Sequence, residues 1–191
     1  ELFYENRELW RSIVGETCSL HFQSVPNCHL VAIDKDQIEQ LFVNLLMNAA
    51  EANATSIRIT VADRIVAADD SFYWQYTAQP LPEGEYIQIT VADNGNGMDS
   101  AILEKLFDPF FTTKFTGRGL GMAATLGIIR GHRGGITVQS HPGMGTVIDF
   151  VLPIPATNSH PTVASSSSPA QHPEDVVGDD KDDKAFISLL L

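Results

Sequence analysis

Residues 86–99 read YIQITVADNGNGMD, and the fold can be worked out from this stretch. Apolar and polar residues alternate over its first six positions, which predicts a half-buried strand. The acid Asp93 follows at once, and Gly95 and Gly97 come after it. An ionised carboxylate only accepts hydrogen bonds, so it suits a ligand edge rich in N–H groups, such as the exocyclic amine of adenine. Glycines there let the main chain approach a ligand closely. A tight turn is the plain alternative for this stretch.

A helix carrying two asparagines is predicted upstream, from Asp34 to about Ala54, because apolar residues recur there at helical spacing. Asn44, Asn48 and Glu51 share one face beside the apolar stripe, at the edge of the core. Asparagine gains nothing in mid-helix unless its amide has a partner. A carboxamide oxygen is a hard, neutral ligand for Mg²⁺, an ion that takes few protein groups together with phosphate oxygens. Amides that satisfy local polar groups are the alternative.

A glycine-rich loop downstream opens another predicted helix. Residues 106–114 read LFDPFFTTK and residues 117–124 read GRGLGMAA, ahead of a helix expected over 125–130. Free N–H groups and the positive end of the helix dipole meet at such a start, which makes it an anion site. Lys114 and Arg118 would add positive charge to it. The glycines also fit the loose pattern of dinucleotide-binding folds, but no strand precedes them, and the Gly-Lys-Ser/Thr of a P-loop is missing.

In this order, the three segments resemble the ATP-binding catalytic domain of sensor histidine kinases, in the superfamily shared with gyrase, Hsp90 and MutL. The resemblance covers about residues 33–153. The motifs that carry it are an N box at 44–52, a G1 box at 93–97, an F box at 107–111, a G2 box at 117–121 and a last strand motif at 143–146. It implies an α+β fold of the Bergerat type: a two-layer α/β sandwich whose mixed, mostly antiparallel sheet is covered by helices on one face.

The resemblance also implies roles for single residues. Asp93 would hold the adenine amino group, and Asn48 would coordinate Mg²⁺. Asn44, Lys114 and Arg118 are the candidate catalytic residues, with Asn44 supporting the phosphate side and the two cations on or near the ATP lid. The candidate ATP-binding residues are Asn44, Asn48, Asp93, Gly95, Gly97, Met98, Lys114, Gly117, Gly119, Leu120, Gly121 and Thr146.

Glu51 departs from the family pattern, because many members carry Lys or Arg three residues after the metal asparagine. Its carboxylate would repel a triphosphate if it pointed inward. We therefore expect the side chain of Glu51 to turn outward.

Asn44 separates two chemistries that the resemblance permits. In the ATPase branch a glutamate at this position activates water, whereas an amide cannot accept a proton at neutral pH. We therefore expect a protein-histidine kinase, which holds the γ-phosphate in line for a histidine acceptor. An ATPase of the gyrase and Hsp90 type and a nucleotide-sensing module without transfer activity are the alternatives.

The acceptor histidine is expected on another domain, since no histidine of this chain is followed by the acid that the family's phosphoacceptor box requires. We interpret all six as structural or solvent-facing: His21, His29, His132, His141, His160 and His172. The expected partners are a histidine-containing dimerisation and phosphotransfer domain of the same full-length protein and a downstream response regulator or receiver domain. Residues 1–18 are interpreted as the end of a preceding helical segment.

Composition agrees with one domain and a tail. The chain of 191 residues is 43% hydrophobic, enough for one good core, which we assign to residues 19–155. Residues 156–191 are interpreted as a flexible, acidic, Ser/Pro-rich linker. A receiver domain after it, as in hybrid kinases, and a frayed end are the two alternatives. The tail holds six of the 24 acidic and two of the 12 basic residues, so it carries −4 of the net charge of −12. This acidity argues against nucleic-acid binding.

Nothing in the sequence predicts contact with a membrane. No apolar run has the length of a span and no signal peptide opens the chain, although an anchor upstream of residue 1 is compatible with this. The two cysteines, Cys18 and Cys28, predict no disulfide framework, so a reducing cytoplasm is the simplest location.

Five strand regions are predicted: 19–32 as one or two strands with a turn at Pro26-Asn27, then 56–62, 85–92, 135–140 and 146–152. Residues 67–84 form a predicted hairpin excursion. Its aromatic residues are assigned to the core rather than to a docking patch: Phe72, Tyr73, Trp74 and Tyr76.

Overall fold

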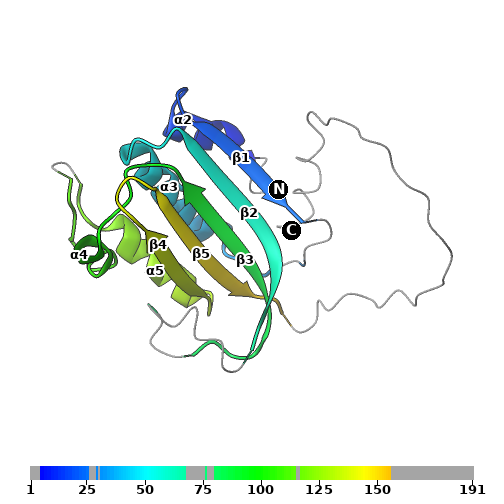
Figure 1. The fold of residues 1–191 in the computed structure, drawn as a ribbon. Coiled ribbons are helices and arrows are strands. Elements are labelled where there is room, and N and C mark those ends of the chain that lie inside the picture. Colours follow the sequence, from blue (N-terminus) through cyan, green and yellow to red (C-terminus); the bar gives the residue numbers. More distant parts are fainter. Residues whose placement is uncertain are drawn as a thin grey trace.

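A single five-stranded β-sheet is the central element of the described structure. The computed structural model describes residues 5–25, 29, 31–67, 76, 80–114 and 117–155. Its elements are α2 (Arg7–Val14), β1 (Ser19–Ser24), α3 (Lys35–Glu51), β2 (Ser56–Val66), β3 (Gly84–Asp93), α4 (Ser100–Leu103), α5 (Gly121–Gly131), β4 (Gly135–Ser140) and β5 (Thr146–Pro153). The strands form one sheet in the order β1-β2-β3-β5-β4. Helices α3 and α5 lie together on one face of it, behind the sheet in Figure 1.

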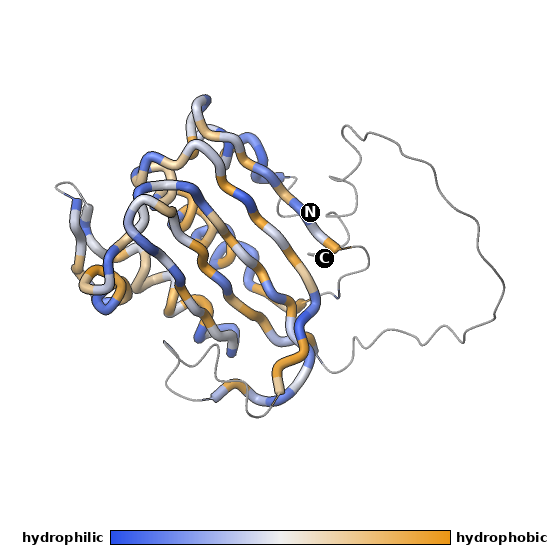
Figure 2. The backbone as a smooth tube through the Cα atoms, in the orientation of Figure 1, coloured by the Kyte–Doolittle hydropathy of each residue, from blue (hydrophilic) through white to orange (hydrophobic). Residues whose placement is uncertain are grey.

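The sheet is mixed and mostly antiparallel, as predicted. Strand β1 runs parallel to β2, and the other three neighbouring pairs are antiparallel. Ile57 and Ile59 of β2 are fully buried while Arg58 between them is exposed, which is the expected alternation. Figure 2 shows this alternation as orange and blue bands along β2 and β3. The apolar side chains of one face therefore form the core under the helices, and the predicted α+β sandwich is confirmed.

Helix α3 supplies the other half of the core. The Asp34 side chain accepts a hydrogen bond from the Gln37 N–H at 3.1 Å and so caps the helix where the sequence predicted its start. The buried stripe consists of Ile38, Leu41, Phe42, Leu45, Leu46 and Ala49. This stripe packs on the sheet, so the neighbouring face of α3 stays at the edge of the core.

Several elements differ from the prediction in their boundaries, and one short helix was not predicted. Strand β2 continues past Ala62 because its pairing with β3 extends to Val66, opposite Gly84. Helix α5 begins at Gly121 rather than at residue 125, since alanines at 123 and 124 favour helix over loop. The short helix α4 was not predicted, although Asp99 caps it by accepting from the Ile102 N–H at 2.9 Å.

Helix α2 packs into the same core, although the sequence interpretation assigned residues 1–18 to a preceding segment. Trp10 is fully buried, with its ring 4.8 Å from that of Phe42 and 6.1 Å from that of Phe22, measured between centroids. A large aromatic side chain buries more apolar area than any other residue type, so this one residue ties α2 to α3.

The four described histidines fit the structural or solvent-facing interpretation. His21 and His141 are exposed. His132 accepts from the Asp34 N–H at 3.0 Å through Nε2, while its Nδ1 lies 2.8 Å from the Ile128 carbonyl. His29 pairs with Asp63 at 2.9 Å.

The segment between β2 and β3 is described only in part. Tyr76 is half-buried, and its ring meets that of Phe107 edge-on at 4.5 Å between centroids, in agreement with the core assignment. Phe72, Tyr73 and Trp74 lie outside the described residues.

Other predictions also lie outside the described residues: those on the Pro26-Asn27 turn, Cys28, His160, His172 and the whole tail 156–191. Within the described part of the chain, no helix has both the length and the apolar character needed to cross a membrane.

Replacing Trp10 by alanine tests whether α2 belongs to this domain. Truncating a fully buried tryptophan should lower the free energy of unfolding by about 3–5 kcal/mol. Its neighbour Leu9 is 46% exposed on the same helix, so Leu9→Ala should cost less than about 0.5 kcal/mol. Urea denaturation measures the loss of unfolding free energy in both variants. Similar small losses would show that α2 is not part of the core.

Candidate functional site

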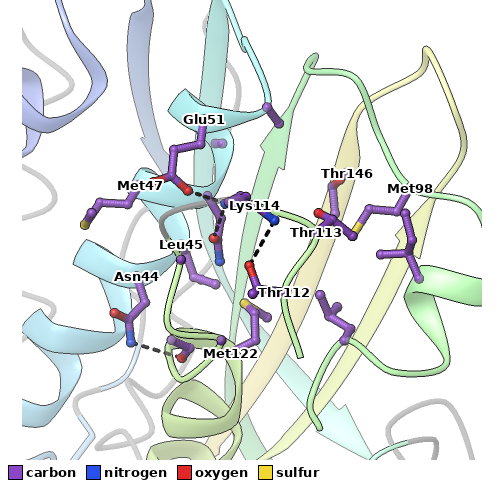
Figure 3. A pocket seen from close by; sticks show the side chains of 18 of the residues that line it. Asn44, Leu45, Met47, Glu51, Met98, Thr112, Thr113, Lys114, Met122 and Thr146 are labelled. Carbon is purple, nitrogen blue, oxygen red and sulfur yellow. Dashed lines mark hydrogen bonds and ion pairs between the residues drawn. The ribbon is translucent and has the colours of Figure 1, made fainter. Parts of the chain in front are cut away.

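A cavity of about 630 Å³ lies between α3, the end of β3 and the segment that leads into α5 (Figure 3). Its volume is that of a typical small-molecule site. The predicted site residues that line it are Asn44, Asn48, Asp93, Gly97, Met98, Lys114, Gly117, Arg118, Gly119, Leu120, Gly121 and Thr146. Of the predicted set, Gly95 alone is absent from the lining. Residues separated by a hundred positions in sequence are thus brought to one place.

Asp93 is the charged group at the sheet end of the cavity. It ends β3 between Ile57 of β2 and Thr146 of β5. Burial raises the pKa of its carboxyl group, and hydrogen bonds from the backbone N–H groups of Gly95 and Thr146 lower it by less, so the pKa stays above its ordinary value. A further N–H donor from a ligand would stabilise the ionised form.

Gly95 supports Asp93 from behind rather than lining the cavity. Its N–H donates to Asp93 Oδ1 at 2.8 Å. A Cβ at this position would lie 2.7 Å from the Ala52 carbonyl oxygen and 2.9 Å from Asp93 Oδ1. The glycine is therefore needed so that this loop can pack against the end of α3.

Gly97 and Gly145 let two loops meet beside Asp93. Their φ angles are +65° and +81°, in the region that favours glycine. A Cβ on Gly97 would lie 1.9 Å from the carbonyl oxygen of His141, and one on Gly145 would lie 2.0 Å from that of Asp93. No other residue fits at either position without moving the backbone.

Ser140 joins these loops, and sequence reasoning missed it. Its hydroxyl oxygen accepts from the Met98 N–H at 2.8 Å and lies 2.9 Å from the Gly145 carbonyl oxygen and 3.0 Å from Thr146 Oγ1. A serine at the end of a strand carries no motif. Only the pairing of Ser140 with Thr146 across β4 and β5 brings it to the site.

The opposite end of the cavity is the start of α5. Leu120 precedes the helix, and its side chain makes no capping hydrogen bond to the first N–H groups of the helix. Gly119 has φ +66°, and a Cβ on it would lie 2.4 Å from the carbonyl carbon of Phe110. Together with the dipole of α5, these N–H groups make an anion site.

The amide of Asn44 ties α3 to α5. Its Nδ2 donates to the Gly121 carbonyl oxygen at 3.1 Å, and its Oδ1 accepts from Gln40 Nε2 at 3.0 Å. Both ends of the amide thus have protein partners, and the first residue of α5 is fixed against the asparagine helix.

Lys114 brings a cation to the second asparagine. Its Nζ donates to Asn48 Oδ1 at 3.0 Å and forms an ion pair with Glu51 (Figure 3). The prediction that Glu51 turns outward was wrong, because it considered only the triphosphate and no neighbouring cation. Arg118 also lines the cavity and is exposed.

The wall between the two ends is apolar and was not identified from the sequence. It includes Leu45, Ala49, Ala52, Val91, Ile102, Leu106, Met122 and Ile148. Such residues look like ordinary core in a sequence, because their spacing is that of the buried stripe. These side chains and Asp93 line the same cavity.

Comparison with known families agrees with this geometry. Residues 33–156 match the family described as "Histidine kinase-, DNA gyrase B-, and HSP90-like ATPase". The chain belongs to this family. Within it, the similarity is to the catalytic domains of sensor histidine kinases, as the relatives below indicate.

Several bacterial sensor kinases are similar in sequence. Sensor kinase CckA of Brucella abortus is 37% identical over 77% of this chain, and the histidine-protein kinase AtoS of Escherichia coli is 36% identical over 63%. Sensor protein FixL of Bradyrhizobium diazoefficiens is 35% identical over 72%. The chain spans only 16%, 17% and 25% of the length of these three relatives.

Solved structures show the same fold. The mycobacterial sensor histidine kinase MprB matches with a TM-score of 0.59 at 20% identity, over 80% of this chain and 91% of that one. The catalytic domain of histidine kinase ThkA, in a nucleotide-free form, matches with a TM-score of 0.54 at 26% identity, over 80% and 88%. The expected histidine kinase catalytic fold is thereby confirmed.

Gly97→Ala tests the close approach of the two loops. A Cβ 1.9 Å from a backbone oxygen, at a positive φ, should lower the free energy of unfolding by about 2 kcal/mol or more. Gly127 lies within α5, where a Cβ would meet nothing within 4 Å, so Gly127→Ala should instead raise it by about 0.5–1 kcal/mol. Thermal or urea denaturation decides, and a neutral Gly97→Ala would contradict the contact.

Proposed function

We propose that this chain binds Mg-ATP and transfers the γ-phosphate to a histidine on a separate dimerisation and phosphotransfer domain of its full-length protein. It would thus act as a protein-histidine kinase. The observation that carries the proposal is a half-buried carboxylate with a raised pKa at one end of an apolar cavity, opposite the start of α5, which lacks a side-chain cap. That arrangement matches the two ends of a nucleotide.

The adenine would bind at Asp93. Its exocyclic amine donates to a carboxylate, and the flat ring fits against apolar residues such as Val91 and Ile148. Gly97 and Thr146, which line the same part of the cavity, leave room for the base. If position 6 of the purine faces Asp93, the carboxylate accepts from the amine of adenine but repels the carbonyl oxygen of guanine, so this orientation favours adenine.

The phosphates would bind at the first turn of α5. The N–H groups of Gly119, Leu120 and Gly121 are the candidate donors, and the dipole of α5 favours a negative ligand there. Lys114 and Arg118 supply positive charge from the segment before the helix. Positioning and charge stabilisation are the main needs of phosphoryl transfer, and these groups meet both.

Asn48 is the candidate magnesium ligand. It lines the cavity, and its Oδ1 accepts from the ammonium of Lys114 in the free chain; with Mg²⁺ at this oxygen, the ammonium would keep Glu51 as its partner. A single amide oxygen suits Mg²⁺, which keeps several waters and binds phosphate oxygens for the rest. When bound, Mg²⁺ would neutralise phosphate charge.

Transfer is favoured over hydrolysis by the state of Asn44. Its amide cannot accept a proton from water, and it is occupied by Gly121 and Gln40. A neutral imidazole needs no such base, because it is nucleophilic at nitrogen near pH 7. This chain therefore needs only to hold the phosphate donor, ATP, in place.

The remaining partners follow from the kinase proposal. A response regulator or receiver domain would take the phosphate from the histidine domain, and the reaction would run in the cytoplasm, where ATP is abundant. An anchor elsewhere in the full-length protein is compatible with both.

The test is transfer from γ-labelled ATP in a mixture of this chain and the histidine domain of the same protein. Label that appears on the histidine domain, and disappears when the acceptor histidine is replaced, supports the proposal. Free phosphate without labelled protein would indicate an ATPase of the gyrase and Hsp90 type. Nucleotide binding with neither product would indicate a sensing module.

Asp93→Asn should have two opposite effects. ATP affinity should fall at least about ten-fold, because the amide presents an N–H group toward the adenine amine. Stability at neutral pH should rise. Burial raises the pKa of Asp93, so the ionised carboxylate costs free energy in the folded state, and that cost disappears as pH falls through the pKa. The variant should therefore exceed the native protein in melting temperature at neutral pH and match it in acid.

Calorimetric titration and thermal melts measure the two effects of Asp93→Asn. Glu85→Gln is the matched control, because Glu85 is an exposed acid on the same strand, far from the cavity. It should change neither quantity. A native-like ATP affinity in Asp93→Asn would remove Asp93 from the binding site.

Asn48→Ala should weaken ATP binding more with Mg²⁺ than without it. The metal-dependent gain in affinity is lost when its candidate ligand is removed, whereas metal-free binding still uses Asp93 and α5. Titrations with and without Mg²⁺ give the two losses, and equal losses would contradict the metal role.

A further inference from the structure

We infer that Glu51 is a positioning residue: its carboxylate holds the ammonium of Lys114 at the phosphate end of the cavity, where Lys114 serves as a fixed cation for the nucleotide. This inference rests on the proposed function, because it concerns how the same cavity receives a triphosphate.

Two acceptors on one face of α3 fix the place of the ammonium. Asn48 and Glu51 are three residues apart, so their side chains are neighbours on the helix surface. Lys114 Nζ reaches both, with 3.0 Å to Asn48 Oδ1 and an ion pair to Glu51 (Figure 3). The Lys114 N–H also donates to Thr112 Oγ1 at 3.1 Å, so the backbone of the lysine is held as well.

Without Glu51 the ammonium would have only the neutral amide of Asn48. Lysine has a flexible stem, and confining it costs rotamer entropy that a single hydrogen bond to a neutral acceptor barely offsets. The carboxylate of Glu51 adds an attraction between two opposite charges that the amide oxygen of Asn48 cannot supply. The carboxylate therefore decides where the positive charge sits, and it places that charge on the cavity wall rather than in solvent.

The pair has little to do with stability. The side chains of Lys114 and Glu51 are 37% and 47% exposed, and exposed ion pairs contribute little to folding. Both residues line the cavity. An exposed pair at the wall of a binding site acts on the ligand, since it orders a donor before the ligand arrives.

The opposite reading is that Glu51 merely repels phosphate and that Lys114 screens it. The two explanations predict opposite changes in Mg-ATP affinity for the Glu51→Gln variant. If Glu51 positions Lys114, then Glu51→Gln weakens Mg-ATP binding, because the ammonium is released. If Glu51 only repels, the same change tightens it.

The experiment is titration of Mg-ATP into the native chain, Glu51→Gln, Lys114→Met and the double variant. Lys114→Met should weaken binding about ten-fold through loss of a charged donor. Glu51→Gln should weaken it about three-fold, the range of an exposed pair, and the double variant should be no weaker than Lys114→Met. Glu39→Gln, on α3 but outside the cavity lining, is the matched control and should leave affinity unchanged.

A relocated ammonium distinguishes positioning from a structural role. Glu51→Lys combined with Lys114→Met supplies the cation from α3 itself, so this variant should bind Mg-ATP more tightly than Lys114→Met alone. A purely structural pair would give no such rescue, and melting temperatures should stay within a few degrees throughout.

The outcomes separate the inference from the proposed function. A folded native chain that binds no Mg-ATP overturns the proposed function. Native binding together with tighter or unchanged affinity in Glu51→Gln, or with fully additive losses in the double variant, overturns the role of Glu51 alone.

Discussion

The carboxylate of Asp93 is half-buried where three strands meet, and removing a charge from water costs free energy unless donors surround it. Two backbone N–H groups, from Gly95 and Thr146, recover part of that cost. The Thr146 N–H comes from a second loop, which approaches closely through Gly145, where a Cβ would lie 2.0 Å from the Asp93 carbonyl oxygen. The remaining cost appears as the raised pKa. A site that keeps such a cost in the free protein is prepared for a ligand that removes it.

Much of the fold could be predicted from the sequence, because both layers carry strong periodic patterns. The strands β2 and β3 alternate apolar and polar residues, and α3 carries an apolar stripe. For each of these patterns, only one orientation of the element buries its apolar face. The start of α5 and the place of α2 were not predicted, for different reasons. The start of α5 was placed too late because Gly121 reads as loop, although a glycine at the first helical position costs little when alanines follow. The place of α2 depends on one long-range contact, Trp10 on Phe42, and no local pattern encodes it.

The site was predictable where a residue type is unusual for its place. An asparagine in mid-helix and an acid at the end of a strand both need a partner, and Asn44, Asn48 and Asp93 do line the cavity. Glu51 was misjudged because its partner, Lys114, is 63 residues away in the chain, so only the folded structure brings the two charges together. Ser140 and the apolar wall carry no such signal. Ordinary residues become part of the site only through strand register and helix packing.

The distribution of charge along the cavity sets the direction in which a nucleotide can lie. One end has a single anion with two donors behind it, and the other has helix N–H groups and two cations on the segment before α5. Reversal would put phosphate against Asp93 and leave the base among cations, so each end rejects what the other accepts. Asn44 keeps the two ends at a fixed separation, because its bond to Gly121 locks α5 to the helix that also carries Asn48. In-line transfer to a separate acceptor domain requires a γ-phosphate that is held at a fixed distance from the group that binds the base.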